Sequence, residues 1–307
     1  MANEIGSTAH VLVGIDGSMS ALEAAAWAAR EAERRRVALR LVHVVDASEA
    51  ETELGPWSQH RMLKYLESRA VDLLAEAQQK VAGLCPEVAV ETSWIVGRPL
   101  PTLIALSREA LLTVVGSSRA EAQGAVHAGS VAVSVSAHGY VPVVVVRGAE
   151  RVSREDQQQT VVVGVDSSEA ADNATEWAFE EAALRAADLT AVFSCGELPG
   201  SLTDSASEPD WWLAYQAQQK QSLVERIARW NERHPEVVTH CAVTTGRPAW
   251  ALMHRAHDAQ LIVVGSRGRS EFVGSVLGST SHTLIHHAPC PVMIVPSRAA
   301  SNRSGQP

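Results

Sequence analysis

Short apolar runs alternate with longer alanine-rich or amphipathic stretches along almost the whole chain. The apolar run at residues 11–15 is followed by a stretch in which Leu22, Ala26 and Ala29 recur at helical spacing. Ser20 and Glu23, at the start of that stretch, have the spacing of a capping box. Strands that alternate with helices are typical of a parallel sheet covered by helices on both faces. The pattern therefore predicts an α/β protein.

The same reading locates the individual elements. Helices are expected around residues 60–82, from the Gly97-Arg98-Pro99 turn to residue 107, and from about residue 130, with proline at the start of the middle one. Strands of the first half are expected at residues 11–15, 39–45, 88–96, 111–115 and 141–146. Strands of the second half are expected near residues 160–165, 189–194, 237–244, 261–264 and 291–295.

The second half of the chain repeats the first about 150 residues further on. Residues 11–18 (VLVGIDGS) return at 161–168 (VVVGVDSS), and the Gly97-Arg98-Pro99 turn returns at 246–248. Such an internal repeat predicts two copies of one domain. We expect the copies at residues 8–147 and 160–297, a polar linker at 148–159, and a disordered polar tail at 298–307.

Composition narrows the class of protein. The 307 residues are 46% hydrophobic and 20% charged, with a net charge of −9. This balance is typical of a globular protein and disfavours a nucleic-acid partner. The four cysteines are scattered without metal-ligand spacing, which favours reduced thiols in a cytoplasmic protein. Neither a signal peptide nor a membrane span is expected.

A glycine-rich loop in the second half is the strongest candidate binding element. An apolar strand ends at Val264 and Gly265, and Gly268 and Gly278 follow before a run of hydroxyl residues. Glycine lets the backbone approach a ligand closely, and the free N–H groups at a helix start favour an anion. The alternative is a plain strand-to-helix connection with glycine turns. The residues expected to hold phosphate are Val264, Gly265, Gly268, Gly278, Ser279, Thr280 and Ser281.

An aspartate follows the first strand of each copy, at Asp16 and Asp166. Taken alone, each is explained by a turn or helix-capping role. Both nevertheless come at the end of a strand whose neighbour enters a glycine loop, and ligands bind at such strand ends. A ligand role is therefore the favoured hypothesis for both aspartates.

The spacing G-x2-G-x9-G-[ST], together with the strand and aspartate, resembles the ATP-binding branch of the universal stress protein family. The resemblance covers about residues 10–147 and 159–296. It implies two doubly wound domains, each a five-stranded parallel sheet of order 3-2-1-4-5, that bind ATP with Mg²⁺. It also implies homodimers, and pairing of the two last strands within one chain. The adenine and ribose positions that it implies are Gly14, Ile15, Val44, Gly164 and Val165, with Ser194 at the place of Val44.

The first copy departs from the motif. It has Val115 and Gly116, but Arg119 stands where the second glycine belongs. The arginine either blocks the approach of the phosphates or contacts them through its guanidinium. The remaining motif positions of this copy are Gly129, Ser130 and Val131. The second copy is therefore the stronger candidate site.

Other chemistry-bearing residues carry weaker signals. His254 and His257, and the cluster at 282–287, have helical spacing but lack a metal motif, so surface or packed positions are favoured. Trp27 and Trp177 are repeated packing positions, and the tryptophan pair at 211–212 is expected in a loop after the second strand. No nucleophile, base and acid can be assembled.

The chain is accordingly interpreted as a non-enzymatic regulatory module of the stress response that signals through nucleotide binding. Three alternatives stay open: a scaffold with a vestigial site, a slow ATPase, and preference for a cyclic nucleotide.

Overall fold

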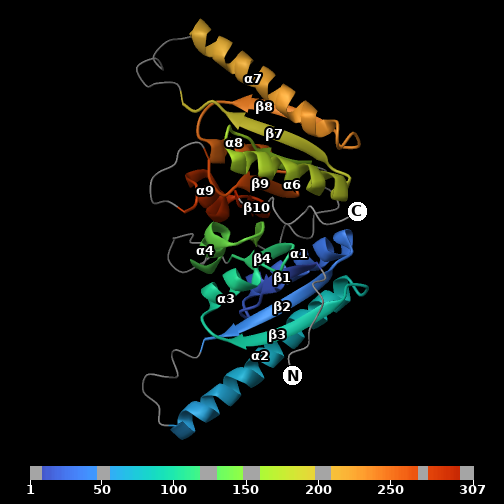
Figure 1. Cartoon of the computed structure of the whole chain (residues 1–307), viewed down its shortest axis with the longest axis vertical. Coiled ribbons are helices and arrows are strands. Elements are labelled where there is room, and N and C mark those ends of the chain that lie inside the picture. Colours follow the sequence, from blue (N-terminus) through green and yellow to red (C-terminus); the bar gives the residue numbers. More distant parts are fainter. Residues whose placement is uncertain are drawn as a thin grey trace. The chain divides into compact units, whose positions relative to one another are not determined.

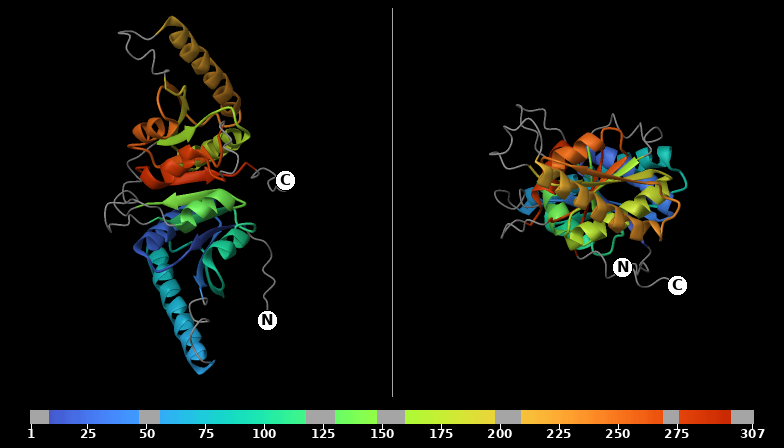
Figure 2. Two further views of the ribbon diagram at one scale, coloured as in Figure 1. Left: turned by 90° about the vertical axis from the view of Figure 1, so that its left-hand side faces the viewer. Right: turned by 90° about the horizontal axis from the view of Figure 1, so that it is seen from above.

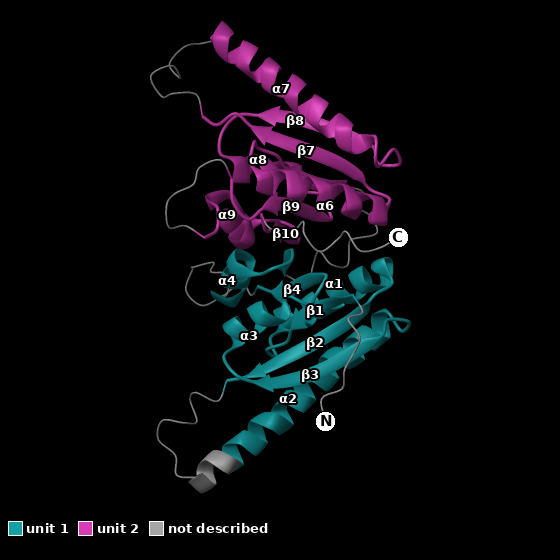
Figure 3. Ribbon diagram, in the orientation of Figure 1, with its two compact units in different colours: residues 1–152 teal, residues 153–307 magenta. Residues whose placement is uncertain are grey.

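The computed structural model describes residues 9–46, 56–117, 130–147, 160–197, 209–268 and 276–297. The chain divides into two compact units, residues 1–152 and 153–307 (Figure 3). Arg119 and Gly129, and the expected linker and tail, lie outside the described residues. Each unit is described below by itself.

Unit 1 contains a parallel sheet in the order β3-β2-β1-β4-β5. The alternation of strand and helix that the sequence predicts is present throughout the described residues (Figure 1). Its strands are β1 (His10–Gly14), β2 (Ala38–Val45), β3 (Val90–Val96), β4 (Leu112–Gly116) and β5 (Val143–Val146). Its helices are α1 (Met19–Arg35), α2 (Pro56–Leu84), α3 (Pro99–Leu106) and α4 (Ser130–His138).

Unit 2 repeats this arrangement, with its parallel sheet in the order β8-β7-β6-β9-β10. Its strands are β6 (Thr160–Gly164), β7 (Asp188–Ser194), β8 (Thr239–Thr244), β9 (Leu261–Gly265) and β10 (Val292–Val295). Its helices are α6 (Glu169–Arg185), α7 (Asp210–Asn231), α8 (Pro248–Arg255) and α9 (Ser279–His287). Each unit thus has the strand order 3-2-1-4-5, with the order reversing between its first and fourth strands.

Helices cover both faces of each sheet. In unit 1, α1 and α2 pack together on one face, whereas α3 and α4 pack together on the other. In unit 2, α6 and α7 lie on one face and α8 and α9 on the other. The two longest helices, α2 and α7, are seen from a second side in Figure 2 (blue and orange). The reversal of strand order leaves the carboxyl ends of β6 and β9 side by side, which is where open α/β sheets bind ligands.

The core of each unit is made by the central strands and the first helix. The strands at the middle of both sheets are almost fully buried, and so are the small side chains of α1 and α6. Trp27 and Trp177 are 1% and 3% exposed, so the prediction of packing positions is confirmed. Each of these helices also carries a buried ion pair one turn apart, Glu31 with Arg35 and Glu181 with Arg185.

Two local predictions are wrong. The N-cap of α1 is Ser18, whose side chain accepts a hydrogen bond from the backbone N–H of Ala21, so the expected capping box at Ser20 and Glu23 does not form. Glu23 is instead buried. Trp211 and Trp212 lie in the first turn of α7 rather than in a loop, and Trp212 is buried while Trp211 is half exposed. In both cases the helix begins earlier in the chain than periodicity alone suggests.

Among the described residues, no helix is both long enough and apolar enough to span a membrane.

Candidate functional site

Asp166 lies directly after β6, in the turn that leads into α6. Its Oδ1 atom accepts hydrogen bonds from the backbone N–H, 2.9 Å away, and from the hydroxyl of Ser168. The Ser168 hydroxyl oxygen in turn accepts from the N–H of Ala171, 3.2 Å away, and caps α6. One oxygen of the carboxylate therefore stabilises the turn, which is the role expected for an aspartate in such a sequence.

The other carboxylate oxygen faces the second glycine loop, by which we mean residues 265–278. A Cβ atom added to Gly268 would stand 2.8 Å from Asp166 Oδ2. Real Cβ atoms do not approach an oxygen so closely, so any larger residue at 268 would move either the loop or the carboxylate. Asp166 and Gly268 are thus brought together by the fold, although more than a hundred residues separate them in the sequence.

Gly265 and Gly164 both lie in closely packed surroundings. A Cβ at Gly265 would lie 2.7 Å from the Cβ of Ala170 on α6. A Cβ at Gly164 would lie 3.0 Å from Val264 and 3.1 Å from Leu252. The close approach of α6 accounts for Gly265 without any ligand, and the side chains of Val264 and Leu252 crowd Gly164. These positions are therefore weaker markers of a binding site than the sequence motif suggests.

The far end of the loop opens helix α9. Gly278 is its N-cap, with φ −66° and ψ 150°, and its N–H donates to the carbonyl of Ser266 at 2.8 Å. An added Cβ here would meet only ordinary contacts of 3.5 Å or more. The N–H groups of the first helical residues after an N-cap lack helical partners and attract anions. Ser279 is exposed and Thr280 half-buried, whereas the Ser281 hydroxyl already donates to the carbonyl of Gly265 at 2.7 Å.

Arg226 contacts the turn of the candidate site but is not predicted by the sequence analysis. From α7 it donates a hydrogen bond to the backbone carbonyl of Asp166. It also forms an ion pair with Asp172 on α6, with Nη2 2.6 Å from Oδ1. The guanidinium therefore fastens α7 to the turn that holds Asp166. Asp172 and Arg226 lie 54 residues apart, so no local spacing marks the pair.

Ser194, at the end of β7, occupies the position that corresponds to Val44. Its hydroxyl donates to the carbonyl of Gly246 at 2.6 Å and accepts from the N–H of Gly196 at 3.3 Å. The same two glycines form an isolated antiparallel bridge. In unit 1, Val44 packs against a buried cluster that contains Leu12. The two units therefore differ here: an engaged hydroxyl in unit 2 corresponds to an apolar contact in unit 1.

The matching turn of unit 1 is built in the same way but is more exposed. Asp16 Oδ1 accepts from the N–H of Ser18 at 2.9 Å. Ile15 precedes Asp16 and is buried, while Gly14 lies close to Leu103. A Cβ at Gly116 would meet the carbonyl of Ser20 at 2.3 Å, so this glycine too is needed for packing. Val115 is buried in β4, Ser130 is exposed at the start of α4, and Val131 is half-buried.

His254 of α8 and His282, His286 and His287 of α9 lie on helices that pack together on one face of the unit 2 sheet, whereas His257 follows the end of α8. The rings of His282 and His286, one turn apart on α9, have centroids 4.6 Å apart, and His286 is buried. His254 lies in the last turn of α8. Within the ranges that the structure describes, no group of three or more histidine, cysteine or acidic residues is arranged to hold a metal ion.

These features define a class. Each unit is a doubly wound α/β domain, and in unit 2 an aspartate after the first strand meets a glycine loop after the fourth. The model of the universal stress protein family matches residues 8–147 and 158–296, once for each unit. The chain belongs to the universal stress protein family.

Individual members of this family are similar to the chain in sequence and in fold. The universal stress protein Rv2623 of Mycobacterium tuberculosis is 34% identical over 299 residues, which cover 94% of this chain and 96% of that protein. A universal stress protein of Mycolicibacterium smegmatis is 35% identical over 294 residues, covering 94% and 97%. The crystal structure of a universal stress protein from Archaeoglobus fulgidus has a TM-score of 0.70 at 20% identity, covering 94% of this chain and 98% of that one. This last likeness concerns the fold.

Proposed function

We propose that unit 2 binds ATP with Mg²⁺ at the second glycine loop, and that the chain is a non-enzymatic regulatory protein of the stress response. The contact geometry between Gly268 and Asp166 Oδ2, 2.8 Å from a hypothetical Cβ, is the observation that carries this proposal. It places one carboxylate oxygen beside Gly268, and Gly278, whose hypothetical Cβ lies 3.6 Å from the Gly268 nitrogen, opens α9 next to it. A carboxylate oxygen beside a helix start suits a cation and its phosphate.

The residues of the loop fit a phosphate group. The triphosphate would lie on the N–H groups that open α9, after Gly278, where the helix dipole favours negative charge. Asp166 Oδ2 would reach Mg²⁺, which commonly takes one or two carboxylates together with phosphate oxygens. When bound, the ion screens the phosphate charge. The exposed Ser279 and Arg267 would donate further hydrogen bonds.

Regulation is favoured over catalysis because no assembled catalytic set accompanies, among the described residues, the groups that we propose to hold phosphate. Phosphoryl transfer needs a positioned base or water together with a cationic clamp. Asp166, the carboxylate that meets Gly268, already has one oxygen engaged in the turn. A bound nucleotide would act by favouring one conformation or assembly over another. The proposal includes a cytoplasmic homodimer, with domains at residues 8–147 and 160–297. Unit 1 is proposed as a second nucleotide site through Asp16 and its glycine loop.

The first test is to identify and quantify nucleotide bound to the purified chain. Mass spectrometry after denaturation, and titration of ATP with Mg²⁺ into nucleotide-free protein, should give about one ATP per chain if only unit 2 binds, and about two if both units bind. The variant Gly278→Ala with Ser279→Ala should lose the unit 2 site. Because a Cβ at Gly278 meets only ordinary contacts, its loss of ATP would report on the ligand rather than on folding.

The matched variant of unit 1 is Gly129→Ala with Ser130→Ala, which should remove the second ATP if both units bind and should leave the bound ATP unchanged if only unit 2 binds. If ATP is neither copurified nor bound on titration, the nucleotide proposal fails and the scaffold alternative takes its place. If ATP is bound and released as ADP at a rate that Asp166→Asn abolishes, the protein is a slow ATPase.

A further inference from the structure

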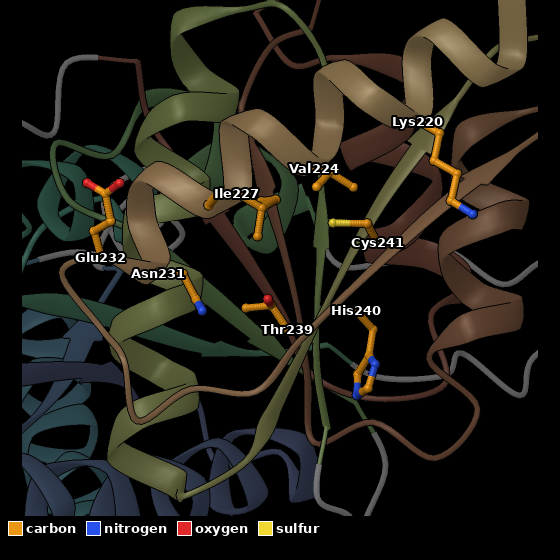
Figure 4. Close-up of a pocket in the computed structure, with 9 residues that line it drawn as sticks. Lys220, Val224, Ile227, Asn231, Glu232, Thr239, His240 and Cys241 are labelled. Atoms are coloured by element: carbon orange, nitrogen blue, oxygen red, sulfur yellow. The ribbon is translucent and has the colours of Figure 1, made fainter.

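The outer edge of the unit 2 sheet carries a groove beneath α7. Between α7 and β8 lies a hollow of about 720 Å³, whose lining side chains are drawn in Figure 4. A second hollow of about 340 Å³ continues it and shares Lys220 and Cys241. We call the two together the edge groove. It is lined chiefly by Lys220, Val224, Ile227, Thr239, Cys241 and Arg255.

The backbone of β8 is open toward this groove. In unit 2, β8 is the edge strand of the sheet and pairs with β7 on one side. The N–H of Leu189 donates to the carbonyl of Val238, and that of Cys195 donates to the carbonyl of Thr244. Since inward and outward groups alternate along a strand, the N–H and C=O groups of Thr239, Cys241 and Val243 point away from β7. No backbone partner for these three is found in the described part of the unit.

This edge lacks the usual protection against strand pairing. Natural edge strands carry charged residues, prolines or bulges that discourage a further strand. The six residues of β8 include no lysine, arginine, aspartate or glutamate, whereas the equivalent edge strand β3 carries Glu91. Thr92 of β3 pairs in register with Leu41 as Cys241 pairs with Ala191. The unit 1 edge therefore offers a matched comparison.

The charges around the edge groove are unequally distributed. Lys220 and Arg255 lie beside the second half of β8, and neither has an ion pair among the described residues. Glu232 lies near the start of the strand. Between the two ends Val224, which is 46% exposed, faces Cys241. The chain has a net charge of −9, so this pair of unpaired cations is a local exception that would attract negative charge.

We propose that the edge groove binds an extended acidic segment of a partner protein, which adds to β8 as a further strand. The outward groups of Thr239, Cys241 and Val243 would form the main-chain hydrogen bonds, as in other cases of strand addition. Small apolar side chains of the segment would pack under Val224, and its acidic side chains would meet Lys220 and Arg255. A single strand fits beside β8 under α7, whereas a second copy of the chain would bring its own α7 to the same edge.

The test uses the full chain and a fluorescein-labelled peptide, acetyl-Thr-Glu-Val-Glu-Val-Asp-amide, with a control peptide in which lysine replaces each acidic residue. Fluorescence anisotropy at low salt should show binding of the acidic peptide only. Cys241→Pro removes the central outward N–H without breaking a bond to β7, so it should weaken binding by about tenfold. Cys241→Ala keeps the N–H and should bind as the parent does. Thr92→Pro, on the unit 1 edge, should have no effect.

Charge variants test the same proposal without placing a proline in β8. Lys220→Glu with Arg255→Glu should weaken binding of the acidic peptide by about tenfold or more, and the loss should shrink at high salt. Equal binding of the two peptides, or equal binding by the parent and both sets of variants, would overturn the proposal. So would a dimer in sedimentation that Cys241→Pro dissociates, because the edge would then belong to a second copy.

Discussion

Arg226 donates a hydrogen bond to the backbone carbonyl of Asp166, and this bond joins α7 to the end of β6. The same guanidinium is held by Asp172, so its position is fixed from two sides. The turn that carries the Asp166 carboxylate is thereby stabilised by a side chain from another helix. Unit 1 has Leu22 at the position of Asp172, and its turn instead packs Gly17, at φ +84°, close to Leu73.

We therefore expect Arg226→Met to weaken ATP binding at unit 2 by about tenfold, because small displacements of a positioned group have large effects on ligand contacts. Arg226→Lys should lie between the parent and Arg226→Met, since lysine keeps the charge but not the planar fork. Calorimetric titration measures the affinity, and thermal unfolding checks the fold. Arg229→Met, on the same helix but exposed, is the control. A similar loss in both methionine variants would disprove a specific role for Arg226.

The glycines of the second loop should separate into two kinds when each is changed to alanine. Gly265→Ala places a Cβ 2.7 Å from Ala170, and overpacking of this kind costs about 1–3 kcal/mol of unfolding free energy. Gly278→Ala meets no close atom and has an ordinary φ, so its effect on stability should stay within about 0.5 kcal/mol. Chemical denaturation measures both. Equal destabilisation by the two variants would show that this division of roles is wrong.

Much of the fold could be predicted from the sequence because its signals are local. The apolar runs, the repeat and the glycine spacing identified the alternation of strands and helices, and the resemblance supplied the strand order. Ser18 and Ser20 show where local signals fail. Both are good caps, and the choice depends on the turn that Asp16 fixes through the N–H of Ser18. Periodicity alone does not contain that choice.

The site was predictable only in part for a related reason. Asp166 and the glycine loop follow strands whose carboxyl ends meet in any sheet of this order, so the motif located them. Arg226 lies on the long helix α7. Its contacts with Asp166 and Asp172 depend on how α7 packs against α6. Similarly, the packing role of Gly265 depends on how closely α6 approaches β9. The spacing of residues along the chain does not specify how closely α7 packs on α6 or how closely α6 approaches β9.

The C-terminal caps of α1 and α6 offer a stability test outside the site. Arg36 and Ala186 both have left-handed backbone conformations, at φ 55° and 49°, where glycine is preferred. Ala186→Gly should raise the free energy of unfolding by about 1 kcal/mol. As a control, Ala183→Gly, a helical residue in the last turn of α6, should lower it by up to about 1 kcal/mol. Denaturant titrations that gave both variants the same sign of change would contradict this account.

Glu23 gives a prediction about pH. Burial raises the pKa of this carboxyl above its usual range, and the charge of Lys80 offsets only part of the effect. A raised pKa in the folded state means that Glu23 contributes stability below its unfolded pKa, and that this contribution is lost as pH rises through the folded pKa. Glu23→Gln removes this pH dependence. The variant should therefore gain stability relative to the parent between about pH 4 and pH 7, measured by denaturant titration at each pH.

The corresponding residue of unit 2 is Asn173, whose side chain donates to the carbonyl of Ser297 at 2.9 Å, so a neutral amide is already accommodated at this place in the fold. A gap between the variant and the parent that stays constant or narrows as pH rises would mean that burial does not control the titration of Glu23.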